Sequence, residues 1–249
     1  MPVSSPASAS DFVIAPSIPP SVPIQGSAQR FAVHRIYCVG RNYAEHVKEM
    51  GGAPPDPTAA GTDRGTPVFF SKPADAIVTG AALEQIPYPR GTLELHHEVE
   101  LVVALGCGID GVVTSEDAPG LIYGYAVGLD LTRRDLQAIA KSKGLPWDTA
   151  KGFDASAPIS TLVPASETTY RDDALLQLEV NGELRQSASL SDMIFDIADV
   201  LHELSKLYDL RAGDLVFMGT PAGVGALRRG DRFVARITGL VELRGGIAV

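Results

Sequence analysis

The sequence has few cysteines, no long apolar segment and no excess of positive charge, and each shortage argues against a class of protein. Its 249 residues include two cysteines, Cys38 and Cys107, without zinc-site spacing. Both lie in apolar, strand-like runs, so we expect buried free thiols in the reducing cytoplasm. No run approaches the roughly 18–20 apolar residues that span a bilayer. No basic segment followed by an apolar one opens the chain, so neither membrane insertion nor secretion is expected.

Positive charge is also scarce. The chain carries 21 Lys and Arg against 30 Asp and Glu, a formal net charge of −9. Nucleic-acid-binding proteins usually present a basic face, and no Lys/Arg cluster here supplies one, so we expect no nucleic-acid partner. Hydrophobic residues make up 45% of the chain, enough to bury a substantial core. The length suits one large domain or two small ones.

The chain begins with a Pro/Ser/Ala-rich segment, residues 1–30, that is typical of an extended arm or a disordered tail, either of which could carry a local anchor. Regular structure is expected to begin with a buried strand at 35–40. Asn42 is then a plausible N-cap of a short helix that Gly51-Gly52 ends. Residues 51–66 are rich in Gly, Pro, Asp and Thr, which indicates a mobile loop.

Short strands and two more helices are expected beyond this loop. The strands are predicted at 67–71, 76–79, 94–105 and 121–130, in a hairpin over 174–190 that turns at Asn181-Gly182, and within 213–247. One helix is expected over 132–143, with Leu136, Ile139 and Ala140 on its apolar face, and another from a cap at Ser191 to about Tyr208. This order does not alternate as βαβ units do, so the predicted class is β-rich α+β.

Three carboxylates, Glu98, Glu100 and Asp130, lie in segments that are otherwise built for burial. Glu98 and Glu100 are two apart on a predicted strand, so their side chains leave the same face, and Asp130 ends the next long apolar strand. Buried carboxylates are costly unless something compensates them, and a bound cation would do so. Oxygen ligands select Mg²⁺, Mn²⁺ or Ca²⁺. The alternative is that the two glutamates face solvent on an edge strand.

Other candidate groups flank these carboxylates. His46 and Glu49 share a helix face, and a carboxylate beside an imidazole suits a general base; the alternative is an exposed pair without a role. Lys151 has an apolar neighbourhood, and a partly buried lysine needs an anionic partner or a role, whereas most nearby cations are expected to be solvated. The Gly-rich residues 219–225 either bind a carboxylate through backbone N–H groups or form only a tight turn.

Six ordered blocks of the sequence resemble one family. They are residues 37–46, 97–100, 128–137, 143–147 with Lys151, 181–183 and 219–225. Together they resemble the fumarylacetoacetate hydrolase family, and most closely its branch of acylpyruvate and fumarylpyruvate hydrolases, over roughly residues 35–245. The resemblance implies a mixed β-sandwich roll with short flanking helices. It also implies a single catalytic domain over 31–249 that follows the arm of residues 1–30, and a homodimer.

The resemblance also implies a set of site residues. They are Glu98, Glu100 and Asp130 for the metal, His46, Glu49 and Lys151 for catalysis, and Arg41, Gln137, Arg134 and Thr220 for substrate binding. One Mg²⁺ or Mn²⁺ per chain is implied as the cofactor. A lid would carry His46 and Glu49 as the general-base dyad, and Lys151 with Gln137 would stabilise an oxyanion. Arg41, Arg134 and Lys72 are candidates to bind a far carboxylate of the substrate.

The implied activity is metal-dependent hydrolysis of a C–C bond in a small oxo-acid, a 3-acylpyruvate. Fumarylpyruvate would give fumarate and pyruvate, the closing step of gentisate catabolism. One alternative is an oxaloacetate decarboxylase, or a homoprotocatechuate-pathway isomerase or decarboxylase, in the same fold. Decarboxylation needs no water activation, so the presence of both His46 and Glu49 favours hydrolysis. A non-catalytic binding homologue is a more distant alternative, whose signature would be loss of a metal carboxylate or of the dyad.

Overall fold

The computed structural model describes residues 12–54 and 65–249, and it confirms the strand-rich α+β class predicted from the sequence. The α-helices are short: α1 (Ala44–Glu49), α2 (Ala118–Leu121), α3 (Arg134–Lys143), α4 (Asp148–Lys151) and α5 (Ile197–Ser205). Further 3₁₀ turns span Ala74–Ala76, Gly80–Gln85, Ala165–Glu167 and Leu190–Asp192. Within the described ranges, no helix has the length and apolar character needed to cross a membrane.

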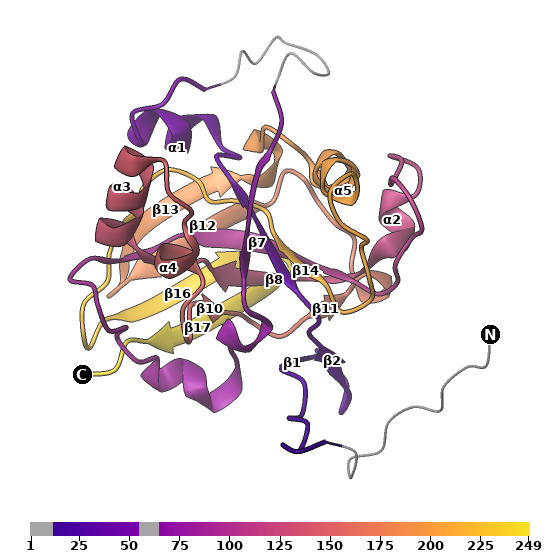
Figure 1. The fold of residues 1–249 in the computed structure, drawn as a ribbon, viewed down its shortest axis with the longest axis horizontal. Coiled ribbons are helices and arrows are strands. Elements are labelled where there is room, and N and C mark those ends of the chain that lie inside the picture. The colour runs from indigo at the N-terminus through magenta and orange to yellow at the C-terminus, as the bar shows by residue number, and fades with distance from the viewer. Residues whose placement is uncertain (1–11, 55–64) are drawn as a thin grey trace.

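A mixed six-stranded sheet forms the centre of the fold (Figure 1). Its strands, in spatial order, are β11 (Val163–Pro164), β8 (Ile122–Leu129), β7 (Val99–Leu105), β14 (Leu215–Phe217), β3 (Ile36–Gly40) and β4 (Val68–Lys72). β14 runs parallel to β3, and the other neighbours are antiparallel. All seven residues of β7 are buried, as expected for a strand that is covered on both faces.

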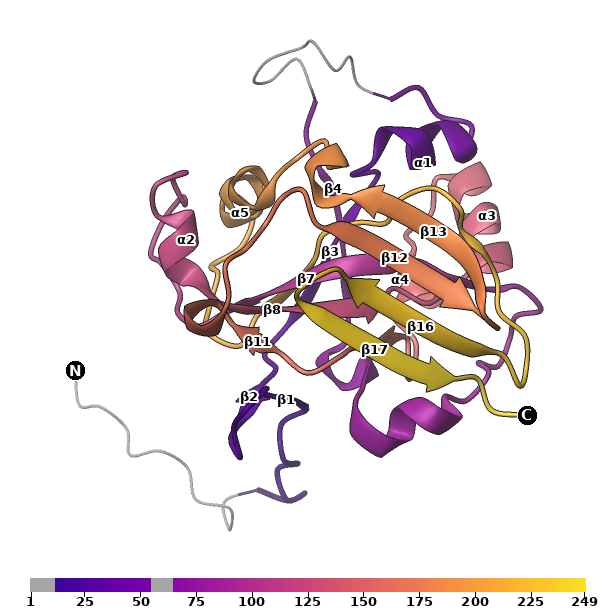
Figure 2. The same ribbon diagram turned by 180° about the vertical axis from the view of Figure 1, so that it is seen from behind.

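A four-stranded antiparallel sheet packs against one face of this central sheet (Figure 2). It contains β13 (Glu183–Ser189), β12 (Leu175–Val180), β16 (Arg232–Ile237) and β17 (Val241–Gly246). One hydrophobic cluster joins the sheets, with Leu101 and Val103 of β7 on one side and Leu178 and Phe233 on the other. Side chains alternate along β7, so Val102 and the residues on its side face away from this sandwich core.

Small sheets complete the fold. Two of them pair β1 (Ser21–Pro23) with β2 (Arg30–Ala32) and β10 (Ala157–Pro158) with β5 (Ile77–Val78). In the third, β6 (Leu95–His97) lies between β15 (Gly225–Ala226) and β9 (Thr132–Arg133) and pairs with both. The expected hairpin over 174–190 is present, and Asn181 and Gly182 both have positive φ, as its two-residue turn requires. The expected strands of residues 213–247 are present as well.

Among the described residues, regular structure begins at Ser21, so the prediction that it starts at 35–40 is wrong. Val22 is fully buried in the second hydrophobic cluster, and Ile24 forms a bridge to Leu162. Phe31 packs against Tyr123 with ring centroids 5.3 Å apart. Apolar side chains between the prolines anchor this segment over the central sheet, a signal that composition alone does not reveal. The boundary at residue 30 stays a prediction.

Two predicted helix caps are wrong. α1 begins after Tyr43, and the Asn42 side chain instead bonds to distant backbone groups. α5 is capped by Asp196 in a reciprocal arrangement with Asp199, and Ser191 lies in the preceding 3₁₀ turn. Asparagine, serine and aspartate all cap well, so a short sequence window does not rank them against tertiary partners. The predicted end of α1 is confirmed, because Gly51 has φ 75° and its N–H donates to the Lys48 carbonyl.

Two predictions of burial are also wrong. Cys107 is exposed just beyond β7, whereas Cys38 is buried as expected, and both thiols are free. On α3, Ile139 is half exposed, and Gln137 is buried in its place. The face of α3 that carries Gln137 is turned toward a polar site, so hydrophobicity does not identify it. The predicted loop at 51–66 lies largely outside the described residues, because residues 55–64 are not described.

Candidate active site

Strand pairing brings the three predicted carboxylates together. Glu98 lies between β6 and β7, Glu100 lies in β7, and Asp130 directly follows β8. In the antiparallel β7–β8 register Val99 pairs with Leu129, and the Asp130 N–H donates to the Glu98 carbonyl at 2.8 Å. Glu98, Glu100 and Asp130, hereafter the acidic centre, are all buried, and each offers an oxygen within 4.8 Å of the others. The alternative of a solvent-facing edge strand is therefore wrong.

Three cations lie against the acidic centre. Lys151 Nζ is 2.7 Å from Glu98 Oε2 and 2.5 Å from Asp130 Oδ2. Lys72 Nζ is 2.8 Å from Asp130 Oδ1, and Arg134 Nη2 bonds to Glu98 Oε1. Lys72 is 3% exposed and Lys151 2%, so these charges have little access to water. The formal charges of the three carboxylates and the three cations cancel, which explains how so many charges are buried together.

The two glutamates of the acidic centre have opposite electrostatic surroundings. Burial alone would raise the pKa of Glu98, but the charges of Lys151 and then Arg134 outweigh burial and hold that pKa well below its ordinary value. For Glu100, burial and then the negative charges of Asp130 and Glu98 raise the pKa well above its ordinary value. No lysine or arginine among the described residues forms an ion pair with Glu100.

The donor set of the acidic centre fits a divalent cation. Asp130 Oδ1 is close to Lys72 Nζ, but the two are not aligned for hydrogen bonding, and this oxygen has no hydrogen-bond partner in the described part of the chain. Glu100 forms no ion pair with a lysine or arginine of the described residues, so added positive charge would stabilise its ionised form, and the unpartnered Asp130 oxygen could bind the same ion. Carboxylate oxygens alone favour Mg²⁺ or Mn²⁺ over softer metals. Glu98, Glu100 and Asp130 would hold such an ion.

A glycine brings a backbone N–H onto Glu100. The Gly219 N–H donates to Glu100 Oε2 at 2.8 Å. Gly219 has φ 90°, and a Cβ added there would lie 2.8 Å from the Cβ of Asn42 and 2.9 Å from the Val39 carbonyl oxygen. The Asn42 side chain in turn donates to the carbonyls of Phe195 and Met218. Only glycine fits this turn without displacing Asn42, and the turn directs its N–H at the acidic centre.

The predicted His46–Glu49 pair is present, with a buried imidazole and an exposed carboxylate, so the alternative in which the whole pair is exposed is wrong. His46 Nδ1 lies 3.1 Å from Glu49 Oε2, and His46 is 7% exposed. An ionised Glu49 can only accept, so Nδ1 donates to it and Nε2 is left as the basic nitrogen. Glu49 Oε1 also accepts a hydrogen bond from the Gly223 N–H at 3.0 Å. This bond fastens α1 to the Gly-rich loop 219–225.

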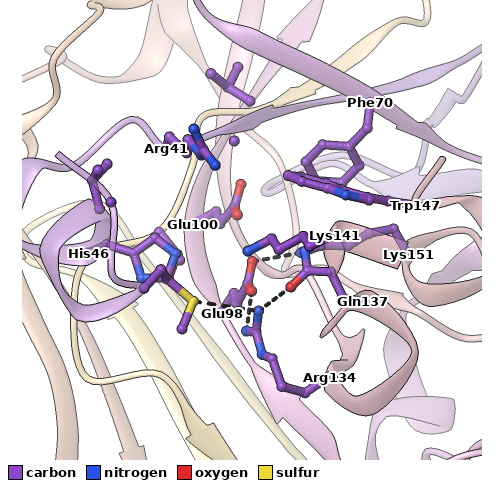
Figure 3. Close-up of a pocket in the computed structure, with 16 residues that line it drawn as sticks. Arg41, His46, Phe70, Glu98, Glu100, Arg134, Gln137, Lys141, Trp147 and Lys151 are labelled. Atoms are coloured by element: carbon purple, nitrogen blue, oxygen red, sulfur yellow. Dashed lines mark hydrogen bonds and ion pairs between the residues drawn. The ribbon is translucent and has the colours of Figure 1, made fainter. Parts of the chain in front are cut away.

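One cavity unites the dyad, the acidic centre and the substrate-binding candidates. Its lining includes His46, Glu98, Glu100, Lys151, Arg41, Arg134, Gln137 and Thr220. Figure 3 shows His46 on one side of the two glutamates, with Gln137 and Lys151 on the other. Asp130 and Glu49 do not line the cavity, but each contacts a residue that does. Asp130 forms an ion pair with Lys151, and Glu49 pairs with His46.

The substrate-binding candidates differ in how firmly they are held. Arg134 Nη1 donates to Gln137 Oε1 at 2.5 Å, and the same guanidinium reaches Glu98. Arg41 has an exposed side chain at the cavity and φ 62°, a left-handed conformation that costs a non-glycine residue about 1–3 kcal/mol. This backbone strain at the cavity rim supports a functional role for Arg41.

Several residues of the site were not predicted from the sequence. Phe70, Trp147 and Lys141 form one wall of the cavity (Figure 3), and Lys141 Nζ lies 5.3 Å from the centroid of the Trp147 ring. Lys72, predicted only as a candidate for a far carboxylate, lies outside the cavity lining and pairs with Asp130. Lys72 ends an apolar strand, which is a sequence signal for a buried, partnered lysine.

Comparisons with known proteins agree with this geometry. The fumarylacetoacetate (FAA) hydrolase C-terminal family matches residues 35–248. The oxaloacetate tautomerase YcgM of Escherichia coli is 42% identical over 216 residues, covering 86% of this chain and 93% of that protein. A mitochondrial oxaloacetate tautomerase, FAHD1 of Arabidopsis thaliana, is 42% identical over 84% of this chain and 89% of its own. Fumarylpyruvate hydrolase from Pseudomonas aeruginosa, solved with Mn²⁺ and pyruvate, has a TM-score of 0.88 and 44% identity, covering 96% of this chain and 99% of that chain.

Replacing Glu98 with Gln should weaken Mn²⁺ binding by at least roughly 100-fold, because a charged ligand is lost and its amide replacement binds hard cations poorly. A Mn²⁺ titration followed by electron paramagnetic resonance measures the dissociation constant without reference to activity. Glu94→Gln, an exposed change four residues upstream, is the matched control and should bind as the wild type does. Equal affinity in the Glu98 variant and the wild type would rule out the acidic centre as the metal site.

Proposed function

The chain belongs to the fumarylacetoacetate hydrolase family, and on that premise we propose that it is a divalent-metal-dependent hydrolase of 3-acylpyruvates. Its proposed substrate is fumarylpyruvate, and the products are fumarate and pyruvate, as at the end of gentisate breakdown. The observation that carries the proposal is the placement of His46, which Glu49 orients, across the cavity from Lys151, with Glu98 and Glu100 between them. The proposed enzyme uses one Mg²⁺ or Mn²⁺ per chain and works as a homodimer.

Charge balance supports a dianionic substrate. The formal charges of the three carboxylates already balance those of Lys72, Lys151 and Arg134, although only Glu98 and Asp130 form the ion pairs. A divalent ion would therefore leave a surplus of two positive charges at the acidic centre, in addition to Arg41 and Lys141 at the cavity, which is costly unless a ligand supplies negative charge. Fumarylpyruvate and oxaloacetate each carry two carboxylates, whereas acetylpyruvate carries one. The site is therefore expected to favour the first two.

The chain's own residues account for the steps of hydrolysis. The cation, when bound, would supply Lewis-acid chemistry at the pyruvate end of the substrate. His46 Nε2 removes a proton from water, and the resulting hydroxide adds to the distal carbonyl carbon. Lys151 and the Gln137 amide donate hydrogen bonds to the oxyanion that forms there. The C–C bond then breaks, the acyl group leaves as a carboxylic acid, and the carbanion of the pyruvate part takes up the proton from His46.

Lys151 is suited to the oxyanion role because it stays protonated. Burial by itself lowers the pKa of the Lys151 ammonium, but the charges of Asp130 and Glu98 outweigh burial and raise that pKa. Gln137 is held in place by Arg134 through its Oε1, and its NH₂ group, which has no hydrogen-bond partner among the described residues, is left to donate to a ligand. Both groups are therefore positioned as donors before any substrate arrives.

Oxaloacetate tautomerisation is the second candidate, and the sequence relatives favour it. Both tautomerases are 42% identical to this chain. Moving a proton between carbon and oxygen needs an acid–base group such as His46 but no attacking water. The structure of the Pseudomonas enzyme, at 44% identity and higher coverage, supports the hydrolase instead. A substrate panel separates the two.

Fumarylpyruvate, acetylpyruvate and the enol of oxaloacetate should each be given to the purified protein with Mg²⁺ and with Mn²⁺. Loss of the enol chromophore measures kcat/KM for each. We expect fumarylpyruvate to have the highest value, with one pyruvate released per turnover, and a chelator to abolish the reaction. Rapid ketonisation of oxaloacetate with no cleavage of fumarylpyruvate would favour the tautomerase and overturn the hydrolase.

Replacing His46 with Ala should lower kcat by roughly 10²–10⁴, because the general base is removed, and should leave the Mn²⁺ dissociation constant unchanged. Steady-state kinetics and Mn²⁺ titration of the same preparation check both parts. Lys48→Ala, an exposed change on the same helix, is the control and should match the wild type. Loss of Mn²⁺ binding in the His46 variant would mean that His46 is not the general base assigned here.

A further inference from the structure

Gln186 is a buried residue on a strand whose other side chains are largely exposed. It lies on β13 (Glu183–Ser189) and is 1% exposed, whereas both of its neighbours are exposed. The pairing of β13 with β12 shifts register here: Gln186 pairs with Leu178 and Leu184 with Glu179. Such an irregularity redirects a side chain, and it coincides with the point where Gln186 turns inward.

The Gln186 amide uses its full hydrogen-bonding capacity. Its Oε1 accepts from the Val99 N–H at 3.1 Å and lies 2.9 Å from His97 Nδ1. Its Nε2 donates to Thr220 Oγ1 and to the Pro221 carbonyl, each at 2.8 Å. A backbone N–H can only donate and a carbonyl can only accept, so Val99 and Pro221 fix which end of the amide is which.

One end of this amide holds the metal-binding segment. Val99 separates Glu98 from Glu100, so the bond to its N–H fixes the backbone between two carboxylates of the acidic centre. His97 precedes Glu98, and its Nδ1 must carry the proton because Gln186 Oε1 can only accept. Gln186 therefore anchors the chain on both sides of Glu98.

The other end orients a group that lines the cavity. Thr220 Oγ1 accepts its hydrogen bond from Gln186 Nε2, so the single proton of the Thr220 hydroxyl is left for a different acceptor. Thr220 is part of the cavity lining, where a substrate carboxylate or carbonyl would be such an acceptor. By this geometry Gln186 makes Thr220 a donor toward the substrate.

Strand β13 also packs against loop 219–225, which is hydrogen-bonded to the His46–Glu49 dyad. A Cβ added at Gly223 would lie 2.1 Å from the Arg185 carbonyl oxygen, so loop 219–225 presses directly on β13 beside Gln186. The Gly223 N–H donates to Glu49, the partner of His46. Gln186 and its neighbour thus connect the acidic centre, Thr220 and the dyad.

We infer that Gln186 is a positioning residue that fixes the metal-binding segment at Val99 and orients the Thr220 hydroxyl toward the substrate. The inference rests on the proposed function. It predicts that loss of the Gln186 amide weakens metal binding and substrate binding together. Both would weaken even though the side chains of the acidic centre and of Thr220 are still present.

The test replaces Gln186 with Met, which keeps the length of the side chain and removes its hydrogen bonds. Gln177→Met is the matched control, since Gln177 lies on the other strand of the same hairpin and, among the described residues, its side-chain amide bonds only to the exposed Ser187. The Mn²⁺ dissociation constant is measured by electron paramagnetic resonance, and KM and kcat for fumarylpyruvate are measured at saturating Mn²⁺. In Gln186→Met, both the dissociation constant and KM should rise roughly 10-fold, and in Gln177→Met neither should change.

A double-variant experiment tests whether the effect on KM passes through Thr220. Thr220→Val alone should raise KM. The double variant with Gln186→Met should have a KM at most about twofold above that of Thr220→Val, because the hydroxyl that Gln186 orients is already gone. A full additional 10-fold rise would overturn the link to Thr220. A folded Gln186→Met protein with wild-type Mn²⁺ affinity and wild-type KM would overturn the whole inference, whatever its melting temperature.

If Gln186→Met does not fold, Gln186→Glu takes its place. The glutamate carboxyl keeps an acceptor for the Val99 N–H. It has no donor when ionised and one when protonated, whereas the glutamine amide donates two hydrogen bonds, to Thr220 and to Pro221. KM should therefore rise in this variant, and a wild-type KM would overturn the role at Thr220. If the wild type binds Mn²⁺ but cleaves no 3-acylpyruvate, the proposed function fails, and the Mn²⁺ titration of Gln186→Met, which lacks the acceptor for Val99, still decides the role at Val99.

Discussion

The burial of three carboxylates at one point is the constraint on which the rest of this structure depends. Removing such charges from water costs several kcal/mol for each ion unless positive charge and hydrogen bonds compensate it. Lys72, Lys151 and Arg134 supply the positive charge, and the Gly219 N–H supplies a hydrogen bond to Glu100. Apolar residues would be more stable at these buried positions. Charged residues that occupy such positions despite the desolvation cost usually mark a functional site.

The fold brings distant parts of the chain to this point. The β7–β8 register places Asp130 beside Glu98, and β14 delivers Gly219 by pairing with both β3 and β7. The Gly-rich loop then continues past β13 to Gly223, where it meets the dyad on α1. The proposed metal ligands, general base and oxyanion donors therefore share one hydrogen-bonded framework, and a change in that framework is expected to affect several of them at once.

The candidate site was more predictable from the sequence than the contacts that support it. Glu98 and Glu100 stand out because two charges interrupt an apolar run, and the spacing of His46 and Glu49 places them on one helix face; both signals are local. Asn42 bonds to Phe195 and Gln186 to Val99, partners 153 and 87 residues away, and no short window of sequence reveals such pairs. The same limit explains the wrong caps and the misplaced face of α3, since tertiary contacts decide which of several suitable residues is used.

The central claim is that the acidic centre holds the cation and faces the pyruvate part of the substrate. Diffraction at the manganese absorption edge, from crystals grown with Mn²⁺ and pyruvate, tests it most directly. We predict one anomalous peak per chain, coordinated by Glu98, Glu100 and Asp130, with pyruvate beside it and His46 across the cavity. A peak elsewhere, with Lys151 still joining Glu98 to Asp130 as it does here, would contradict the claim.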